Sequence, residues 1–266
     1  MNFLQLIAQQ KKLHTIEKVI GSDDLRKLQK EIDAVATSFL KEHHPEYTSY
    51  LQTIHALLYQ RSKEELLELD IYEDHHRPIE VITDATMPAT IKKLKKEKLL
   101  GFDTESKPVF EKGQTQSIDV IQISSSRACY IFQLNIISYP AMLETIIQDS
   151  SIKKIGVGLG SDIKSLREDL QLRCEGFIDL NTIFEYLGRH NNIGSKQLVA
   201  SILNRNLKKS KKVTVSNWAA QVLSPAQLSY ASDDAFSSLD AFIMLGKLLK
   251  DHETYLQPKL VKLLGI

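Results

Sequence analysis

The sequence predicts an α/β fold that follows an all-helical N-terminal extension. From residue 78 onward, short runs rich in β-branched and aromatic residues alternate with stretches of helical periodicity, which is typical of a sheet flanked by helices. Across residues 1–77, apolar residues recur at helical spacing instead. A chain of 266 residues also exceeds the usual size of one domain. We therefore predict two parts, a helical region over residues 1–77 and a second domain over residues 78–266.

The helical region is interrupted by polar breaks. Gly21-Ser22-Asp23-Asp24 ends one predicted helix and caps the next, which His43-His44-Pro45 ends. The apolar positions of that second helix follow helical spacing and are Leu25, Leu28, Ile32, Val35, Phe39 and Leu40. A third helix is predicted over residues 47–60, and Ser62 with Glu65 opens a fourth as a capping box. These apolar faces must pack against each other, the second domain or another subunit. A homo-oligomer and a complex with a protein partner are therefore both alternatives for residues 1–77.

The second domain alternates between the two periodicities. Its predicted strands cover residues 78–82, 99–106, 117–124, 128–133 and 152–157, with the third and fourth paired as a hairpin. Its predicted helices cover residues 88–98 and 193–203, a segment that starts near Asp162, and a late helix from Pro225 onward. Strands separated by helices in this way predict the α/β class.

Composition limits the class of protein. The net charge is +1, but residues 78–266 carry 24 Lys and Arg against 20 Asp and Glu, a net +4, whereas residues 1–77 carry 10 against 13, a net −3. The two cysteines, Cys129 and Cys174, form neither a disulfide framework nor a metal-ligand spacing. The adjacent pairs His43-His44 and His75-His76 cannot chelate one ion, because neighbouring side chains point apart. Since the sequence also has no signal peptide and no apolar run of membrane-spanning length, we expect a soluble protein of the cytoplasm or nucleus with no membrane partner.

Three groups of acidic residues stand out. Asp103 and Glu105 end an apolar strand run and, two positions apart, point to the same face. Asp162 follows the glycines of a strand end and falls in the first turn of a helix, where a simple helix cap is the alternative. Tyr230 and Asp234 are four apart on one face of the late helix. Asp233 is turned away by about 100°, so Asp234 is the better metal ligand.

These motifs and their flanks resemble the DEDD 3'–5' exonucleases, in the tyrosine-bearing branch, over about residues 78–250. The flanks that agree are Lys112-Gly113 before Ile121-Gln122-Ile123, then Gly156-Val157-Gly158, and Ser216-Asn217-Trp218. They are more similar to the exonuclease domain of Werner-type proteins than to ribonuclease D. The resemblance implies a ribonuclease-H-like mixed sheet flanked by helices.

The resemblance also implies a mechanism. Carboxylate ligands without cysteine or histidine suit two Mg²⁺ or Mn²⁺ ions, which can clamp the scissile phosphate. Asp103 would bridge both ions, Glu105 and Asp234 would complete the site that holds the attacking water, and Asp162 would serve the second ion. Tyr230 would orient the water, and the product would be a nucleoside 5'-monophosphate released from a DNA or RNA 3' end. The Werner-type flanks favour DNA, and the alternative is an inactive nucleic-acid-binding or scaffold protein on the same fold.

Two lysine clusters could contact nucleic acid. The first contains Lys92, Lys93, Lys95, Lys96 and Lys98, and it fits the solvated face of a helix that turns Ile91 and Leu94 inward. The second lies in a predicted loop before Val213, outside any amphipathic pattern, and contains Lys208, Lys209, Lys211 and Lys212. We therefore predict the second cluster as the contact to the phosphate backbone.

Overall fold

The computed structural model describes residues 44–73, 76–108, 117–138, 140–189 and 191–266. The chain divides into two compact units, Met1–Gln52 and Thr53–Ile266. The helices predicted before residue 44 lie outside the described residues. Within the described ranges, no helix is long and apolar enough to cross a membrane.

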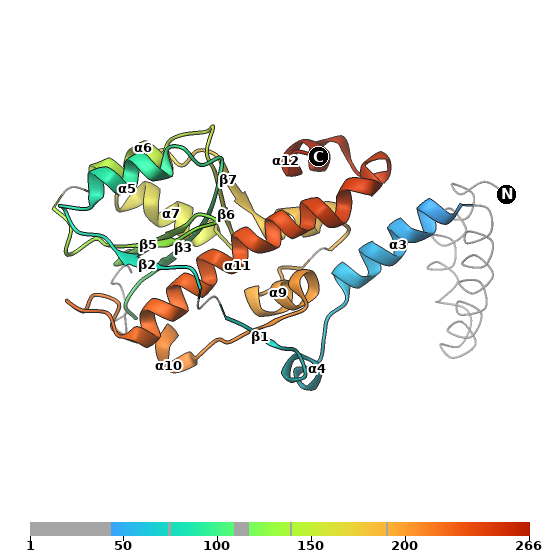
Figure 1. Ribbon diagram of the computed structural model, residues 1–266, viewed down its shortest axis with the longest axis horizontal. Helices are drawn as coiled ribbons and strands as arrows, with labels where there is room; N and C mark the ends of the chain where they lie inside the picture. Colours follow the sequence, from blue (N-terminus) through green and yellow to red (C-terminus); the bar gives the residue numbers. More distant parts are fainter. Residues whose placement is uncertain (1–43, 74–75, 109–116, 139, 190) are drawn as a thin grey trace, which may run out of the picture. The chain divides into compact units, whose positions relative to one another are not determined.

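Helices and strands alternate through the second unit (Figure 1). The helices are α3 (Pro45–Leu58), α4 (Lys63–Leu67), α5 (Met87–Leu94), α6 (Ala141–Ile147), α7 (Gly160–Glu168), α8 (Leu180–Tyr186), α9 (Ser195–Leu203), α10 (Lys211–Thr214), α11 (Pro225–Leu249), the 3-10 helix η1 (Lys250–Tyr255) and α12 (Pro258–Leu264). The strands are β1 (Ile71–Tyr72), β2 (Ile79–Val81), β3 (Leu99–Glu105), β4 (Val120–Ser124), β5 (Cys129–Gln133), β6 (Lys153–Gly156), β7 (Phe177–Asp179) and β8 (Asn206–Leu207).

The central sheet has six strands in the order β2-β5-β4-β3-β6-β7. Strand β4 runs antiparallel to both β3 and β5, whereas the β2–β5, β3–β6 and β6–β7 pairs are parallel. A mixed sheet flanked by helices confirms the predicted fold class. The hairpin of β4 and β5 and the late helix are also as predicted.

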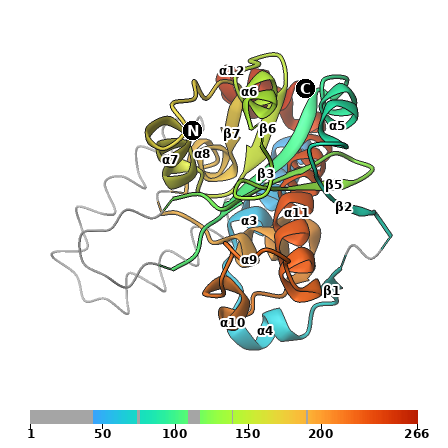
Figure 2. The ribbon, with the colours of Figure 1, turned by 90° about the vertical axis from the view of Figure 1, so that its left-hand side faces the viewer.

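Helices cover both faces of the sheet (Figures 1 and 2). Because side chains alternate along a strand, β4 sends Ile121 and Ile123 into the core shared with α5, α6 and α7, and Val120 into the core shared with α9 and α11. Helix α11 starts as predicted, with Pro225 at its first turn and a capping box between Ser224 and Gln227. This long buried helix lies directly on β3, where the acidic strand residues are.

Residues 53–77 pack within the second compact unit. Strand β1 pairs in parallel with β8, Tyr72 donates a hydrogen bond to Asp240 of α11 at 2.6 Å, and Arg77 forms an ion pair with Asp240 at 2.6 Å. Arg61 donates to the carbonyl of Ala200 in α9 at 2.7 Å. The two compact units meet between Gln52 and Thr53, and the functional boundary at residue 77 stays a prediction.

Candidate active site

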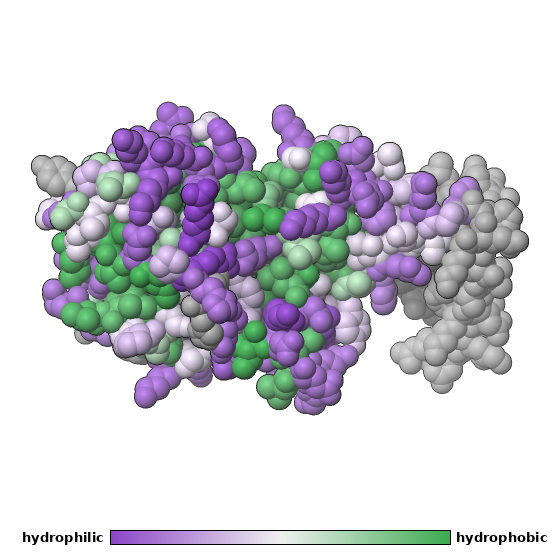
Figure 3. All heavy atoms as spheres, in the orientation of Figure 1, coloured by the Kyte–Doolittle hydropathy of each residue, from purple (hydrophilic) through white to green (hydrophobic). Residues whose placement is uncertain are grey.

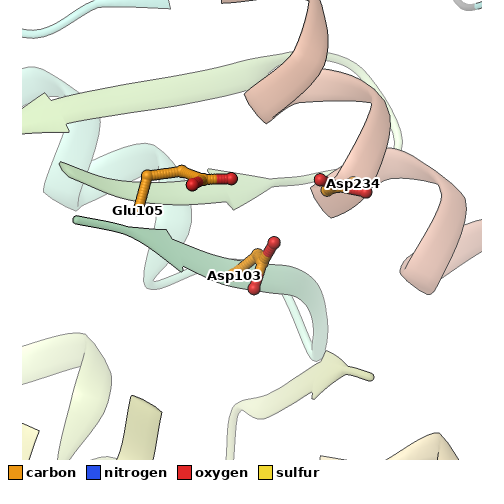
Figure 4. Close-up of side chains that lie close together, drawn as sticks. All are labelled: Asp103, Glu105 and Asp234. Atoms are coloured by element: carbon orange, nitrogen blue, oxygen red, sulfur yellow. The ribbon is translucent and has the colours of Figure 1, made fainter. Parts of the chain in front are cut away.

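Strand β3 and helix α11 bring three carboxylates together (Figure 4). One carboxylate oxygen from each of Asp103, Glu105 and Asp234 lies within 4.8 Å of the other two. Asp103 and Glu105 are on alternate positions of β3 and therefore share the face that α11 covers. Asp234 completes the cluster from the helix, as the motif spacing predicted.

A glycine allows this close approach of helix and strand. Gly101 is on the same face of β3 as the two acids, and a Cβ atom at Gly101 would lie 1.9 Å from the carbonyl oxygen of Ala235. Any side chain there would collide with the backbone of α11, next to Asp234. Glycine inside a strand often marks such an approach, so Gly101 is a sequence signal of the contact between α11 and β3.

Burial and mutual repulsion disfavour ionisation of the cluster. Burial raises the pKa of Glu105 to about 8, and the charge of Asp234 adds to the shift. Burial and the neighbouring carboxylates, Asp234 first among them, raise the pKa of Asp103 well above its ordinary value. Burial also raises the pKa of Asp234, against the opposing effect of Lys209. A bound cation would offset the repulsion between carboxyl groups held this close and would favour their ionised form.

The donor set fits a divalent cation. In the described part of the chain, Asp234 Oδ2 is buried without a hydrogen-bond partner, and a buried polar atom without a partner is costly. Its other oxygen, Oδ1, accepts a hydrogen bond from Lys209 Nζ. Carboxylate oxygens without nitrogen or sulfur ligands suit hard ions such as Mg²⁺ and Mn²⁺.

Asp162 lies outside this group of three. It is in the first turn of α7, as predicted, and its Oδ1 accepts a hydrogen bond from Thr104. Thr104 stands between Asp103 and Glu105 on β3 and points to the opposite face. The negative charge of Asp162 nevertheless contributes to the raised pKa of Asp103, after burial and Asp234, so Asp162 is an electrostatic neighbour of the cluster.

Tyr230 stands one helical turn before Asp234, at the edge of the cluster. Its hydroxyl oxygen lies 3.0 Å from Thr214 Oγ1 and accepts a hydrogen bond from Lys209 Nζ at 3.3 Å. Burial, followed by the charge of Asp234, raises the pKa of Tyr230. The phenol therefore remains protonated at neutral pH, and as a hydrogen-bond donor it can orient a neighbouring group.

The four lysines predicted to contact the phosphate backbone lie in different environments. Lys209 points into the carboxylate cluster, and its side chain is 28% exposed. Burial alone would lower its pKa, but attraction to Asp234, Tyr230 and Asp103 raises it overall. Lys208 instead forms an ion pair with Glu73 at 3.2 Å. Lys211 and Lys212 are exposed and begin α10, a short helix where the sequence predicted a loop.

The span that contains these residues decides the family. Residues 78–250 match the sequence profile of the family described as 3'-5' exonuclease. This chain belongs to the 3'-5' exonuclease family. The match covers the same stretch as the resemblance inferred from the motifs, and it supports assignment to the DEDD superfamily. The tyrosine-bearing pattern of Tyr230 and Asp234 is compatible with it.

One similar protein and two similar structures accompany this match. The mouse bifunctional 3'-5' exonuclease/ATP-dependent helicase WRN is 33% identical over 153 residues, which is 56% of this chain and 11% of that protein. The Aedes aegypti Nibbler EXO domain superposes with a TM-score of 0.61 at 22% identity, over 73% of this chain and 99% of that domain. Trypanosoma brucei RNase D, solved in a complex with the RNA U12, has a TM-score of 0.57 at 17% identity, over 70% of this chain and 64% of that chain. These two structures share the fold of this exonuclease-family chain.

The positions of Lys209 and Thr214 in the site carry no recognisable sequence signal, whereas that of Gln122 does. The inward position of Lys209 depends on a contact with Asp234, far away in the sequence, and Thr214 reaches Tyr230 in the same way. Gln122 pairs with Asp103 across β3 and β4 and is 0% exposed. A glutamine between two isoleucines that face the opposite core is a recognisable sequence signal of a polar group on the active-site face.

Proposed function

We propose that this chain is a metal-dependent 3'–5' exonuclease that releases nucleoside 5'-monophosphates from nucleic-acid 3' ends. The observation that carries the proposal is the cluster of Asp103, Glu105 and Asp234, with Tyr230 beside it, inside the span that matches the exonuclease family. Every acidic position of the motif is present. The alternative is a catalytically inactive binding or scaffold protein on the same fold, and it would show no degradation of DNA or RNA with either metal ion.

Asp103, Glu105 and Asp234 would hold Mg²⁺ or Mn²⁺, with Asp162 serving a second ion. When bound, such ions neutralise phosphate charge and acidify a coordinated water. The chain's own residues position the metal ligands and the reacting groups. Thr104 holds Asp162 in place, and the protonated phenol of Tyr230 orients the attacking water or a phosphate oxygen.

The substrate we propose is a DNA or RNA 3' end, with DNA favoured by the Werner-type motif flanks. Lys208, Lys209, Lys211 and Lys212 would contact its phosphate backbone. Lys209 is best placed of the four, because its ammonium group already lies beside Asp234 and Tyr230. An incoming phosphate would offer this ammonium group a second anionic partner next to the carboxylates.

The helical region has a separate proposed role. We propose that residues 1–77 act in packing or assembly, through a subunit contact or a protein partner, and that residues 78–266 form the exonuclease domain. The contacts of Tyr72 and Arg77 with Asp240 support a packing role for the end of this region.

The test compares Asp103→Asn and Asp234→Asn with Asp233→Asn as the matched control. Asp233 is next to Asp234, outside the cluster, and its carboxylate accepts a hydrogen bond from Ser229 at 3.4 Å. On 5'-labelled DNA and RNA oligomers we expect activity that requires Mg²⁺ or Mn²⁺ and disappears in EDTA. The two cluster variants should be several orders of magnitude slower and should bind Mn²⁺ more weakly by calorimetry, while Asp233→Asn remains near wild type. Near-normal cleavage by either purified cluster variant would exclude the proposed site.

A further inference from the structure

A groove opens beside the carboxylate cluster and has no assigned role. Its volume is about 750 Å³. One wall is the segment 67–71, after α4, and the other comes from α9, β8 and the loop that precedes α10. The side chains with charge or exposed apolar surface that line it are Leu67, Glu68, Asp70, Ile71, Lys196, Lys208 and Lys209.

Lys209 joins this groove to the active site. The residue lines the groove, yet its ammonium group contacts Asp234 and lies 3.3 Å from the Tyr230 hydroxyl. The groove therefore begins where the proposed reaction takes place. A polymer whose end lies at the carboxylates would reach this groove by passing Lys209.

The wall formed by residues 67–71 is fixed in position. Ile71 pairs with Asn206 and Tyr72 with Leu207 in the β1–β8 ladder. Asn206 N donates to the carbonyl of Asp70 at 2.8 Å. This segment precedes residues 78–250, the span that matches the family. The groove is thus shaped by a part of the chain outside the matched exonuclease sequence.

The lining combines apolar surface with positive charge. Leu67 is 74% exposed and Ile71 is 39% exposed, which is unusual for large apolar side chains on one short segment. Figure 3 shows apolar surface beside hydrophilic side chains at the place of α4. Lys196 stands across from them in the first turn of α9. Proteins that bind single strands combine a positively charged groove, which follows the phosphates, with side chains on which bases stack, most often aromatic ones. In this groove the surface offered to the bases is aliphatic and comes from Leu67 and Ile71.

Two acids also line the groove, and they limit its net charge. Asp70 is paired with Arg205 at 3.3 Å, so its charge is compensated. Glu68 lies beside Leu67 at the end of α4. Lys208 is likewise paired with Glu73, and Lys209 with Asp234, so the net positive charge of the groove is small. Packing of bases on Leu67 and Ile71 therefore has to supply much of the binding, which favours an unpaired strand over a duplex, whose bases are stacked on one another.

We propose that this groove holds the nucleotides on the 5' side of the scissile phosphodiester in a single-stranded nucleic acid. The proposal rests on the proposed exonuclease function and adds to it the path of the trailing strand. It predicts that substrate preference depends on length, because a short oligomer reaches the carboxylates without filling the groove.

The experiment uses the full chain and 5'-labelled single strands of two, four, six and twelve nucleotides, measured as single-turnover kcat/KM with Mg²⁺. The variant is Leu67→Glu with Lys196→Ala. Its matched control is Leu248→Glu with Lys92→Ala, because Leu248 is also exposed and Lys92 lies on α5, across the sheet. We expect the groove variant to lose about 10-fold or more on the twelve-nucleotide strand and progressively less on shorter ones. The control variant should match wild type at every length.

The outcomes separate the two proposals. If wild type degrades no substrate with Mg²⁺ or Mn²⁺, the exonuclease proposal fails and the groove proposal fails with it. If wild type is active but the groove variant loses the same factor at every length, only the groove proposal is overturned. An equal loss on blunt duplex and single strand would also overturn it, because the occupant would then be a duplex. Thermal midpoints of all variants, together with photocrosslinking of a thiopyrimidine oligomer to residues 67–71, show whether a loss of rate reflects lost binding rather than lost folding.

Discussion

At the scale of single residues, Lys209 supplies a positive charge to the acidic cluster. Buried carboxylates this close together repel one another, and the side-chain ammonium group beside Asp234 offsets part of that repulsion. Lys209 therefore stabilises the folded chain when no metal ion is bound. In the presence of substrate, the same group is in position to attract a phosphate.

Replacing Tyr230 tests whether its hydroxyl positions a reacting group. Tyr230→Phe keeps the ring that packs near Trp218, with ring centroids 6.0 Å apart, and removes only the oxygen next to Thr214 and Lys209. We expect kcat to fall about 10- to 1,000-fold, since a positioned group that handles protons typically contributes about 10²–10⁴-fold, while calorimetric Mn²⁺ binding stays unchanged. An unaltered single-turnover rate would mean that the tyrosine serves only packing.

The raised pKa of Glu105 predicts how metal-free stability depends on pH. Its pKa is about 8 in the folded chain against an ordinary 4.5, so between these values the folded state binds more protons than the unfolded state. Stability in EDTA should therefore fall as the pH rises from about 4.5 to about 8. Thermal midpoints measured across this range should show the decline, and Glu105→Gln should flatten it. A midpoint that rises with pH equally in both proteins would contradict this explanation.

Local spacing was sufficient to predict which residues of the acidic motifs share a face. Asp103 with Glu105, and Tyr230 with Asp234, do so because of the strand and helix repeats alone. That the two pairs meet was implied by the resemblance to the DEDD exonucleases, and the structure brings Asp103, Glu105 and Asp234 together. The hydrogen bond from Thr104 to Asp162 and the inward turn of Lys209 depend on how separate elements meet. Contacts between separate elements leave no periodic pattern in the sequence, so they could not be predicted from it.

At the scale of elements, the active site depends on how closely α11 approaches β3. Gly101→Ala should push the helix away, because the new Cβ would lie 1.9 Å from the Ala235 carbonyl. We expect a loss of about 1–3 kcal/mol in the free energy of unfolding and at least a 10-fold loss of exonuclease rate, measured by urea denaturation and oligomer degradation.

Gly246→Ala on the same helix is the control for this change. Among the residues that the structure describes, a Cβ at Gly246 would have only Ile266 Cγ2 within 4 Å, at 3.9 Å, and alanine is favoured over glycine inside a helix. It should be neutral or stabilising and fully active. If both variants behave alike, the helix–strand contact at Gly101 is not a constraint on the site.

The elements themselves were predictable to different degrees. Long periodic segments such as α11 and the β4–β5 hairpin were found, because apolar spacing and the Ser224-Pro225 start were clear. Strand β7, with three residues, is too short to show a period. Strand β6 contains a buried lysine that the sequence does not indicate. Lys154 is 0% exposed and donates to the carbonyls of Ile146, Asp149 and Ile152 at 2.7–3.0 Å. No sequence pattern distinguishes this lysine from its exposed neighbour Lys153.

At the scale of the whole molecule, truncation separates the two compact units. A chain that starts at Thr53 should keep the thermal midpoint and exonuclease activity of the full chain. A chain that starts at Arg77 should unfold at a markedly lower temperature, because it loses the β1–β8 pairing and the Tyr72 hydrogen bond to Asp240. Calorimetric midpoints, the oligomer assay and light scattering check this prediction.

Tyr72→Phe in the full chain is the control that isolates one of these contacts. Losing the partner of a buried hydrogen bond costs about 1–3 kcal/mol, so this variant should fall between the full chain and the shorter truncation. Equal midpoints for chains starting at Thr53 and Arg77 would instead place the structural division at residue 77, as the sequence pattern suggested.

The cluster of carboxylates is drawn from distant parts of the chain, and this has a consequence during protein synthesis. Asp103 leaves the ribosome long before Asp234, and at about 5–20 residues per second the delay is on the order of 10 s. Until α11 emerges and covers β3, the nascent chain carries Asp103 and Glu105 but not the third carboxylate. If the proposed exonuclease activity needs all three carboxylates, the chain would lack it while it is still beside messenger and ribosomal RNA, and would gain it only when α11 folds onto β3.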